Sequence, residues 1–212
     1  MEQTTLNPIT AIQDLKNPNS TTINDLPPNF IDKGFKNFEA GSELETKKNH
    51  CIEFAKGQKD KKSLVLCGAV GNGKTHLAVA VAKNFRMKNN QYEHQKNIAP
   101  SIQFLNADEF FMSLNDRTSQ GKGKLEYIKE LFTKNDLVIL DDLGISNFTP
   151  AKQENLFVFL NRAYNYNMSI IITTNFTLED FENIDSRISS RLCEMAFIIE
   201  FDFDDFRLKN VS

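Results

Sequence analysis

Residues 63–85 read SLVLCGAVGNGKTHLAVAVAKNF. The apolar run over 63–67 predicts a buried strand, and the apolar spacing over 74–85 predicts a helix. Between them, residues 68–75 match the pattern G-x-x-x-x-G-K-[ST] and contain three of the chain's nine glycines. A glycine-rich turn between a strand and a helix lets backbone N–H groups point inward around phosphate oxygens. The stretch therefore predicts a nucleotide-binding loop.

Individual residues of this loop have predicted roles in binding phosphate and Mg²⁺. Lys74 would reach the β- and γ-phosphates, the Thr75 hydroxyl would ligate Mg²⁺, and the start of the helix would add its partial positive charge. The predicted cofactor-binding residues of the loop are Gly68, Ala69, Val70, Gly71, Asn72, Gly73, Lys74, Thr75 and His76.

A second motif, residues 137–142, reads LVILDD and predicts a strand that ends in two adjacent carboxylates. In a parallel sheet the carboxyl ends of the strands are where ligands bind. Asp141 is predicted to hold Mg²⁺ together with Thr75, and Asp142 to accept a proton from the attacking water. A solvated acidic turn before Gly144 is the alternative for the pair taken alone.

Two further motifs follow along the chain. Residues 173–175 read TTN at the end of a β-branched strand, where the amide of Asn175 could orient a water without adding charge. Residues 186–192 read SRISSRL and predict a helix with Arg187 and Arg191 one turn apart on a shared face. Either both arginines are solvated, or one of them stabilises phosphate charge in a neighbouring subunit.

The fold class follows from the alternation of strands and helices, which is typical of an α/β protein with a parallel sheet between helices. A polar stretch over 115–124, with two glycines, predicts a mobile loop. The predicted strands are 63–67, 101–105, 137–140, 169–173 and 197–201, and the predicted helices are 74–85, 108–114, 156–164 and 186–192.

Composition limits the class of protein. The chain has 212 residues, 25 Lys+Arg against 28 Asp+Glu, a net charge of −3 and 40% hydrophobic residues, which predicts one globular domain without a basic coat for nucleic acid. An apolar run of about 18–20 residues, as a membrane span needs, is absent, and the N-terminus lacks a leader, so we expect a cytoplasmic protein. Three scattered cysteines predict neither a disulfide framework nor a zinc site.

The N-terminal region differs from the rest of the chain. Its first thirty residues hold four of the six prolines and are rich in Asn and Thr. Such a segment buries too little apolar surface to offset its ordering entropy. We predict a flexible segment over 1–34, in which Ile9, Ile12 and Leu15 have the spacing of a short partner-binding helix, and a single domain over 35–212.

Taken together, these motifs resemble a known family. GAVGNGKTHLAVAVA, LVILDDLG, IITTN and SRISSRL, preceded by FKNF at 35–38, resemble the ATPase domain of DnaC/DnaI-type replicative-helicase loaders and of the related IstB-like transposition helpers. The likeness covers about residues 35 to 207. It implies an AAA+ P-loop domain with a five-stranded parallel sheet flanked by helices, and ATP with Mg²⁺ bound between subunits.

The resemblance also implies roles for individual residues. It places Lys74 on the phosphates, Asp142 as the catalytic carboxylate and Asn175 as the sensor of the γ-phosphate. Arg191 becomes the arginine finger acting in the neighbouring subunit, and Arg207 a late arginine that contacts nucleotide in its own subunit. Many AAA+ proteins have Glu where Asp142 stands, so we predict slow ATP hydrolysis that is stimulated by a partner or by DNA.

The implied partners are a DnaB-type hexameric replicative helicase, single-stranded DNA and further copies of the chain in an ATP-dependent homo-oligomer, without a membrane. The short N-terminal region departs from the larger helicase-binding domain of such loaders, and it is in keeping with a phage-borne protein. For DNA, the stretch 116–124 carries Arg117, Lys122 and Lys124, which could follow phosphates. A solvated connector is the alternative for this stretch.

The function predicted is that of an ATP-dependent helicase loader in replication initiation. The alternatives are an IstB-like transposition helper that acts on duplex DNA, and an inhibitor of the host helicase or of its loader. A small-molecule kinase is disfavoured because no arginine-rich lid follows the Asp-Asp strand.

Overall fold

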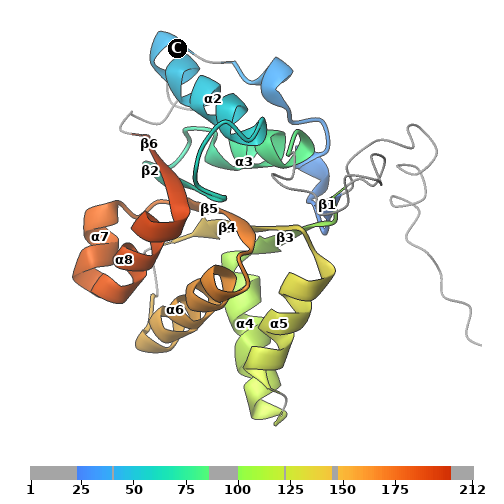
Figure 1. The fold of residues 1–212 in the computed structure, drawn as a ribbon, viewed down its shortest axis with the longest axis vertical. Coiled ribbons are helices and arrows are strands. Elements are labelled where there is room, and N and C mark those ends of the chain that lie inside the picture. The colour runs from blue at the N-terminus through green and yellow to red at the C-terminus, as the bar shows by residue number, and fades with distance from the viewer. Residues whose placement is uncertain (1–22, 40, 86–99, 122, 145–147, 202–212) are drawn as a thin grey trace, which may run out of the picture.

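The structure is a computed structural model that describes residues 23–39, 41–85, 100–121, 123–144 and 148–201. Its centre is a six-stranded parallel sheet with the strand order β1-β3-β4-β5-β2-β6 (Figure 1). The strands are β1 (Ile23–Asn24), β2 (Ser63–Gly68), β3 (Ile102–Asn106), β4 (Leu137–Leu143), β5 (Ser169–Thr174) and β6 (Ala196–Phe201).

Helices cover both faces of this sheet, as the fold class predicts. One face carries α2 (Ser42–Ala55) and α3 (Lys74–Lys83). The other face carries five helices, which are α4 (Ala107–Ser119), α5 (Lys124–Lys134), α6 (Pro150–Asn165), α7 (Leu178–Ile184) and α8 (Ser186–Met195).

Strand β2 contributes side chains to two hydrophobic cores, one on each face of the sheet. All six of its residues are buried. Leu64 and Leu66 pack with α2 and α3, whereas Val65 and Cys67 pack with the helices of the opposite face, because successive side chains of a strand point to opposite sides. A strand that is apolar on both faces thus places the phosphate loop on a rigid base.

The predicted five strands are all present, and β1 is an addition to them. It lies within the segment 1–34 that we expected to be flexible. Ile23 and Asn24 pair with β3, Pro28–Phe30 form the 3₁₀ turn η1, and Ile23 is buried, so this part of the segment packs on the sheet. The other part of that segment, including the predicted helix at Ile9, Ile12 and Leu15, lies outside the described residues.

Three helices are longer than predicted, including α8, which continues to Met195. Helix α4 continues to Ser119, so the stretch 115–119 is helical rather than part of a mobile loop. Its buried stripe contains Phe110, Phe111 and Leu114, which anchors the helix to the sheet. Helix α6 starts at Pro150, where the Thr149 side chain accepts a hydrogen bond from the helix backbone.

Residues 23–38, which comprise β1 and most of the connection from β1 to α2, are here named the strap. It contains η1 and a second 3₁₀ turn, η2 (Phe35–Asn37), and it runs along α3 (Figure 1). Lys83, at the end of α3, donates hydrogen bonds to the carbonyls of Phe30, Ile31 and Lys33. In the described part of the chain, no helix is both long enough and apolar enough to span a bilayer.

Candidate functional site

The phosphate loop is the turn between β2 and α3. Gly68, Gly71 and Gly73 have φ angles of 113°, 84° and 76°, a region that side-chain-bearing residues rarely adopt. Gly73 is the N-cap of α3, and no side chain caps this helix end. The first-turn N–H groups and the helix dipole therefore form an anion-binding end.

The two polar side chains that open α3 lie where the motif predicts. Lys74 Nζ donates to Gly68 O at 2.8 Å and to Ala69 O at 2.5 Å, so its ammonium lies within the loop. The Thr75 hydroxyl forms a hydrogen bond with the Asp141 carboxylate. The two predicted Mg²⁺ ligands are thus brought into contact from separate elements.

The two carboxylates at the end of β4 have different surroundings. Asp141 is buried, with 7% of its surface exposed, whereas the neighbouring Asp142 is exposed. Asp142 has a φ of 58°, in the left-handed region that Asp and Asn tolerate better than most residues. This turn of the backbone coincides with an irregularity of the β4–β5 register between Leu140 and Leu143.

Burial raises the pKa of Asp141 above its ordinary value, and the charge of Asp142 acts in the same direction. Hydrogen bonds from Thr173 and Thr75 and the charge of Lys74 lower the pKa of Asp141, without cancelling the effect of burial. A buried carboxylate that is costly to ionise is stabilised when a cation binds beside it.

A cavity of about 340 Å³ joins the loop to these carboxylates. It lies at the carboxyl edge of the sheet, where β4, β5 and β2 are neighbours. Its lining contains nine residues from the predicted set, namely Val70, Gly71, Asn72, Gly73, Lys74, Thr75, Asp141, Asp142 and Asn175. The structure therefore brings most of the predicted site residues together.

Three residues of the lining were not predicted. Thr173 lies in the TTN motif, and its spacing two residues before Asn175 was the available signal. Asn106 ends β3 at the same edge, and its side chain caps α4 by accepting from the backbone of Asp108 and Glu109. Phe30 reaches the cavity from the strap, which is distant in sequence, so no local pattern indicates it.

His76 does not line the cavity with its side chain. Its imidazole nitrogen Nε2 lies 3.2 Å from Gly34 N and 2.9 Å from Gly34 O, and the ring packs edge-on against Phe38, with 5.0 Å between the ring centroids. Burial lowers the pKa of His76 below its ordinary value. The His76 side chain thus connects α3 to the strap. Only its backbone, in the first turn of α3, is placed to take part in cofactor binding as predicted.

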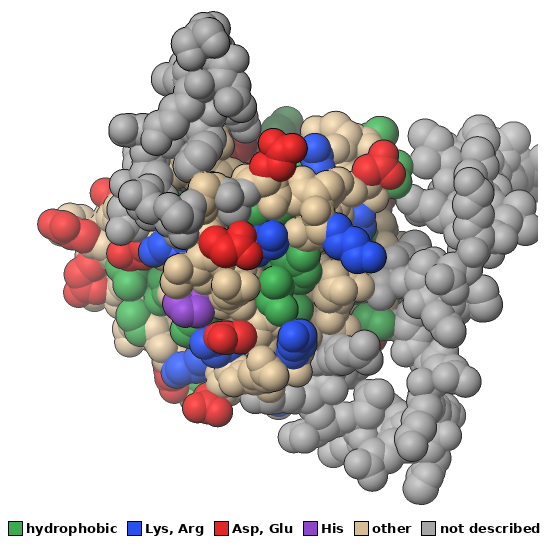
Figure 2. Space-filling view, turned by 90° about the horizontal axis from the view of Figure 1, so that it is seen from above, with side chains coloured by type: hydrophobic (Ala, Val, Ile, Leu, Met, Phe, Trp, Pro, Cys, Tyr) green, Lys and Arg blue, Asp and Glu red, His purple; other side chains and the backbone are tan. Residues whose placement is uncertain are grey.

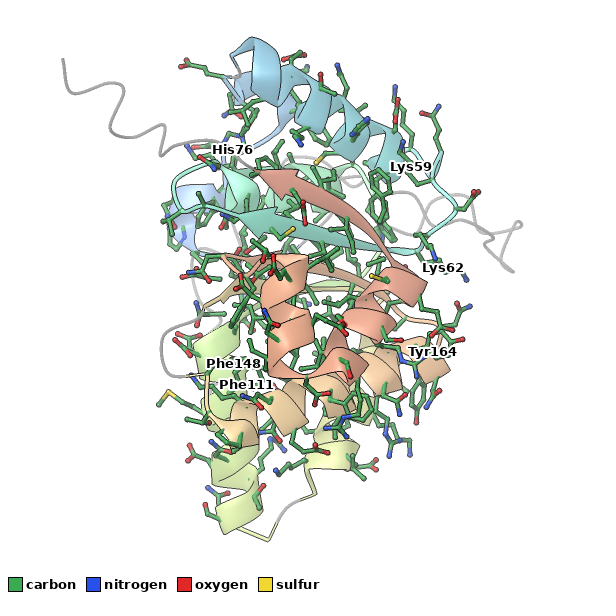
Figure 3. All side chains as sticks on the ribbon, turned by 90° about the vertical axis from the view of Figure 1, so that its left-hand side faces the viewer. Lys59, Lys62, His76, Phe111, Phe148 and Tyr164 are labelled. Carbon is green, nitrogen blue, oxygen red and sulfur yellow. The ribbon has the colours of Figure 1, made fainter. Side chains whose placement is uncertain are left out.

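The predicted arginine finger lies away from the cavity of its own chain. Arg191 donates to Glu194 at 2.7 Å and to Asn161 at 3.2 Å, and its guanidinium lies over the Tyr164 ring. Figure 3 shows Tyr164 on the same side as Lys62, at the opposite end of the sheet from His76. A contact between Arg191 and the phosphates of its own subunit is therefore excluded in this conformation.

Arg187, on the same helix, is also engaged within its own chain. It pairs with Asp185 at 2.7 Å and with Glu154 at 3.1 Å, and it lies over the Phe157 ring. These ion pairs raise the pKa of Arg187 above its ordinary value. Both candidate arginines are thus held in defined orientations by acidic and aromatic neighbours.

The predicted DNA contacts are only partly described. Arg117 packs over the Tyr127 ring at 4.2 Å, and Lys124 Nζ donates to Asn155 Oδ1 at 3.0 Å. Lys122 and Arg207 lie outside the described residues. On the face seen in Figure 2, acidic and basic side chains are interspersed, so the described residues there form no track of one sign. The DNA hypothesis from the sequence concerns the stretch 116–124, of which residue 122 lies outside the described residues.

The residues present fit a nucleotide with Mg²⁺. The loop offers backbone N–H groups, Lys74 and an uncapped helix end, and Thr75 and Asp141 offer the hard oxygen ligands that Mg²⁺ prefers. The described residues hold no cluster of three His, Cys, Asp or Glu side chains. Mg²⁺ beside a nucleotide needs only about one or two carboxylates, because the phosphates complete its shell.

Comparison with known proteins identifies relatives of this chain. The family model described as "IstB-like ATP binding protein" matches residues 28–212. The chromosomal replication initiator protein DnaA of Treponema pallidum (strain Nichols) is 28% identical over 166 residues, which are 76% of this chain and 32% of that protein. The chain thus spans about a third of the length of the curated relatives it matches.

Solved structures with the same fold include a DnaC helicase loader and a DnaI structure. A DnaC helicase loader has a TM-score of 0.66 and 19% identity, and the match covers 83% of this chain and 100% of that one. A DnaI structure has a TM-score of 0.61 and 22% identity, with coverage of 87% and 95%. At such identities the likeness shows the fold alone. The predicted α/β fold with a parallel sheet and the resemblance to IstB-like proteins are confirmed.

Proposed function

The chain belongs to the family of IstB-like ATP-binding proteins, and on that premise we propose that it is an ATP-dependent helicase loader. It binds the hexameric replicative helicase and single-stranded DNA, and it places the helicase on the DNA during replication initiation. The observation that carries the ATPase part is that the phosphate loop, Asp141, Asp142 and Asn175 all face one cavity.

The reaction proposed is ATP hydrolysis to ADP and phosphate. Water attacks the γ-phosphorus as the bond to the β–γ bridging oxygen breaks, and Asp142 accepts the proton of that water. Asn175 orients the water, and Lys74 offsets charge on the β- and γ-phosphates. Bound Mg²⁺ supplies further charge neutralisation, and Thr75 and Asp141 are the side chains that would hold it.

The short side chain of Asp142 supports slow intrinsic hydrolysis. Its backbone already occupies the left-handed region, so its carboxylate extends from a turn rather than from a regular strand. We infer that the protein acts as a switch, in which hydrolysis is stimulated by the helicase or by DNA.

Arg191 is proposed to act on ATP bound by a neighbouring copy, in an ATP-dependent homo-oligomer. Its distance from the cavity of its own chain supports this assignment. To reach a phosphate in the next subunit, Arg191 has to give up or share its contacts with Glu194 and Asn161. Arg207 is proposed to contact nucleotide in its own subunit.

The helicase and DNA partners are supported by the relatives. A DnaC helicase loader and DnaI share the fold, and DnaA proteins named as replication initiators share sequence over about three-quarters of this chain. The phage origin and the cytoplasmic location stay predictions.

The deciding experiment is light scattering after size exclusion of the full chain mixed with its host's hexameric helicase. The mixture is measured with ATP, with ADP and with the Lys74→Ala variant. We expect a complex whose mass depends on ATP and is lost in the variant. Absence of a complex under every condition contradicts the proposal.

Two other functions have distinct outcomes in the same set of measurements. An IstB-like transposition helper would form no complex with the helicase and would assemble on duplex DNA when ATP is present. An inhibitor would bind the helicase or its loader and lower helicase loading in a DNA-unwinding assay. The presence of Asp141, Asp142 and Asn175 in one cavity favours the loader over the inhibitor, since blocking alone needs no hydrolytic residues.

A further inference from the structure

A single buried hydroxyl connects the two carboxylates of the site. Thr173, in β5, is 1% exposed. Its Oγ1 donates a hydrogen bond to Asp141 Oδ1 at 2.6 Å and accepts one from the backbone N–H of Asp142 at 2.8 Å. A threonine hydroxyl has one proton to donate, so these two contacts define its orientation.

The contact with Asp142 replaces a missing strand hydrogen bond. The pairing of β4 with β5 is irregular between Leu140 and Leu143, and Asp142 adopts a φ of 58° there. An N–H that leaves the regular ladder needs another acceptor when water is excluded. The Thr173 hydroxyl is that acceptor, and it stabilises the backbone turn that points the Asp142 side chain outward.

The contact with Asp141 orients a buried carboxylate. One of its oxygens accepts from Thr173, and the carboxylate is also bonded to Thr75 of the phosphate loop. A charged group held by two hydrogen bonds has fewer alternative rotamers. Thr173 therefore acts on the acidic Mg²⁺ ligand and on the backbone of the catalytic carboxylate at once.

We propose that Thr173 is a positioning residue for ATP hydrolysis, which holds Asp141 in its Mg²⁺-binding orientation and Asp142 in its water-activating orientation. The proposal rests on the proposed ATPase function. The role is one of positioning, because the hydroxyl's hydrogen bonds to Asp141 and to the backbone of Asp142 are both made to the protein.

Thr174, the next residue, is a matched control. It is equally buried at 1%, and its hydroxyl also makes two hydrogen bonds, to Leu143 O at 2.7 Å and from Phe176 N at 3.0 Å. These bonds hold the strand end and reach neither carboxylate, and Thr174 does not line the cavity. A merely structural role for Thr173 would make the two threonines equivalent.

The test compares Thr173→Val, Thr173→Ser and Thr174→Val in the full chain. Valine keeps the β-branched shape and removes the hydroxyl, whereas serine keeps the hydroxyl. Three experiments are made on each variant: ATPase kinetics for kcat and KM, titration of a fluorescent ATP analogue with Mg²⁺ and with EDTA, and thermal unfolding for the midpoint.

For Thr173→Val we expect kcat to fall about 30- to 100-fold with KM within about threefold, since misplacing a reacting group by about 1 Å costs about that much. The enhancement of analogue binding by Mg²⁺ should fall about fivefold to tenfold, as expected for a buried charged acceptor that loses its donor. Affinity in EDTA should stay within about twofold, because the phosphate loop is unchanged.

The controls separate positioning from folding. Thr173→Ser should keep kcat within about threefold of the parent, because the hydroxyl is retained. Thr174→Val should lower the unfolding midpoint by about as much as Thr173→Val and leave kcat within about threefold.

Two results overturn the proposal. One is parental kcat and parental Mg²⁺ enhancement in Thr173→Val, and the other is equal loss in Thr173→Val and Thr174→Val. A parent protein that neither binds the analogue nor hydrolyses ATP contradicts the proposed function itself, and so is distinguished from failure of this inference.

Discussion

The ring of Phe38 lies so close to Gly73 that a Cβ on Gly73 would stand 2.6 Å from Phe38 Cε2. Phe38 belongs to the strap and Gly73 to the phosphate loop. The FKNF motif at 35–38 is therefore packed directly on the predicted phosphate-binding turn. The shape of the loop depends on a side chain 35 residues earlier in the chain.

This contact predicts an energetic coupling between the two positions. Gly73→Ala should lower ATP affinity, both because its φ of 76° disfavours a side chain and because the new methyl meets the ring. In a Phe38→Leu background the clash is relieved and only the backbone cost persists. We expect a coupling energy of about 1 kcal/mol between the two changes, measured by ATP titration of both single variants and the double variant. Additive effects would contradict direct packing.

Two glycines with positive φ should respond differently to alanine. Gly68 has a φ of 113°, and a Cβ there would lie 2.2 Å from the Phe201 carbonyl oxygen, whereas at Gly121 a Cβ would meet no described atom within 4 Å. Gly68→Ala should lower the free energy of unfolding by more than about 3 kcal/mol, and Gly121→Ala by about 1 kcal/mol. Urea titration of both variants is the measurement. Equal losses would mean that backbone conformation, and not crowding by β6, is decisive.

Substitutions at Asp142 separate its chemistry from its backbone. Asp142→Asn keeps a residue that tolerates the φ of 58° and removes the proton acceptor. We expect hydrolysis to fall about 10²- to 10⁴-fold while ATP binding persists, as measured by phosphate release and nucleotide titration. Asp142→Glu should destabilise the fold by about 1 kcal/mol without raising the rate, because the longer side chain is less suited to that backbone. Hydrolysis by Asp142→Asn at the parental rate would exclude Asp142 as the base.

The stability of the protein should depend on the charge of His76. Because burial lowers the pKa of His76 below 6.5, the unfolded chain binds the proton more readily than the folded one. The contribution of neutral His76 to folding is complete above pH 6.5 and is lost as the pH falls from 6.5 through the lowered value. In His76→Gln, the drop in unfolding free energy between about pH 7.5 and 5.5 should be smaller than in the parent, because the group that titrates in this range is gone.

Chemical denaturation of His76→Gln and the parent at both pH values is the measurement. Glutamine can keep a hydrogen bond with Gly34, so the comparison isolates the titrating group. An identical pH dependence of the unfolding free energy in the two proteins would show that protonation of His76 does not change the stability of the fold.

The cations near the α4–α5 turn should contribute to single-strand binding. Lys122→Ala with Lys124→Ala should weaken binding of an oligonucleotide and reduce the slope of log affinity against log salt by about 1.4, as for two lost phosphate contacts. The matched control is Lys129→Ala with Lys134→Ala, which removes equal charge from α5 at side chains paired with Glu126 and Glu130. An equal loss of affinity and of salt slope in the control would show that the net charge of the protein, and not these two lysines, determines DNA binding.

One of these lysines also has a structural contact. Lys124 donates to Asn155, which is 3% exposed, so its loss leaves a buried carbonyl without that donor. The unfolding midpoint of the double variant should therefore be measured beside DNA binding. A loss of binding that follows only from unfolding at the assay temperature would remove this stretch from the DNA proposal.

Local patterns were sufficient for the parts of the site that lie within one element. The phosphate loop follows from glycine spacing between a strand and a helix, and the position of Asp141 follows from the end of an apolar strand. The length of α4 was underestimated because its polar outer residues resemble a loop in sequence. The buried stripe of Phe110, Phe111 and Leu114 decides that it is helical.

The sequence by itself determined the α/β class, the five principal strands, the nucleotide loop and the identity of the two carboxylates, because each depends on residues within a few positions of one another. Only the tertiary structure decided that Thr173 joins those carboxylates, that Phe30 reaches the cavity and that Arg191 is held far from it. The physical reason is that these contacts depend on the register in which the strands pair. Parallel strands distant in sequence are set side by side by the packing of two apolar faces, and contacts across them exist only once that packing is complete.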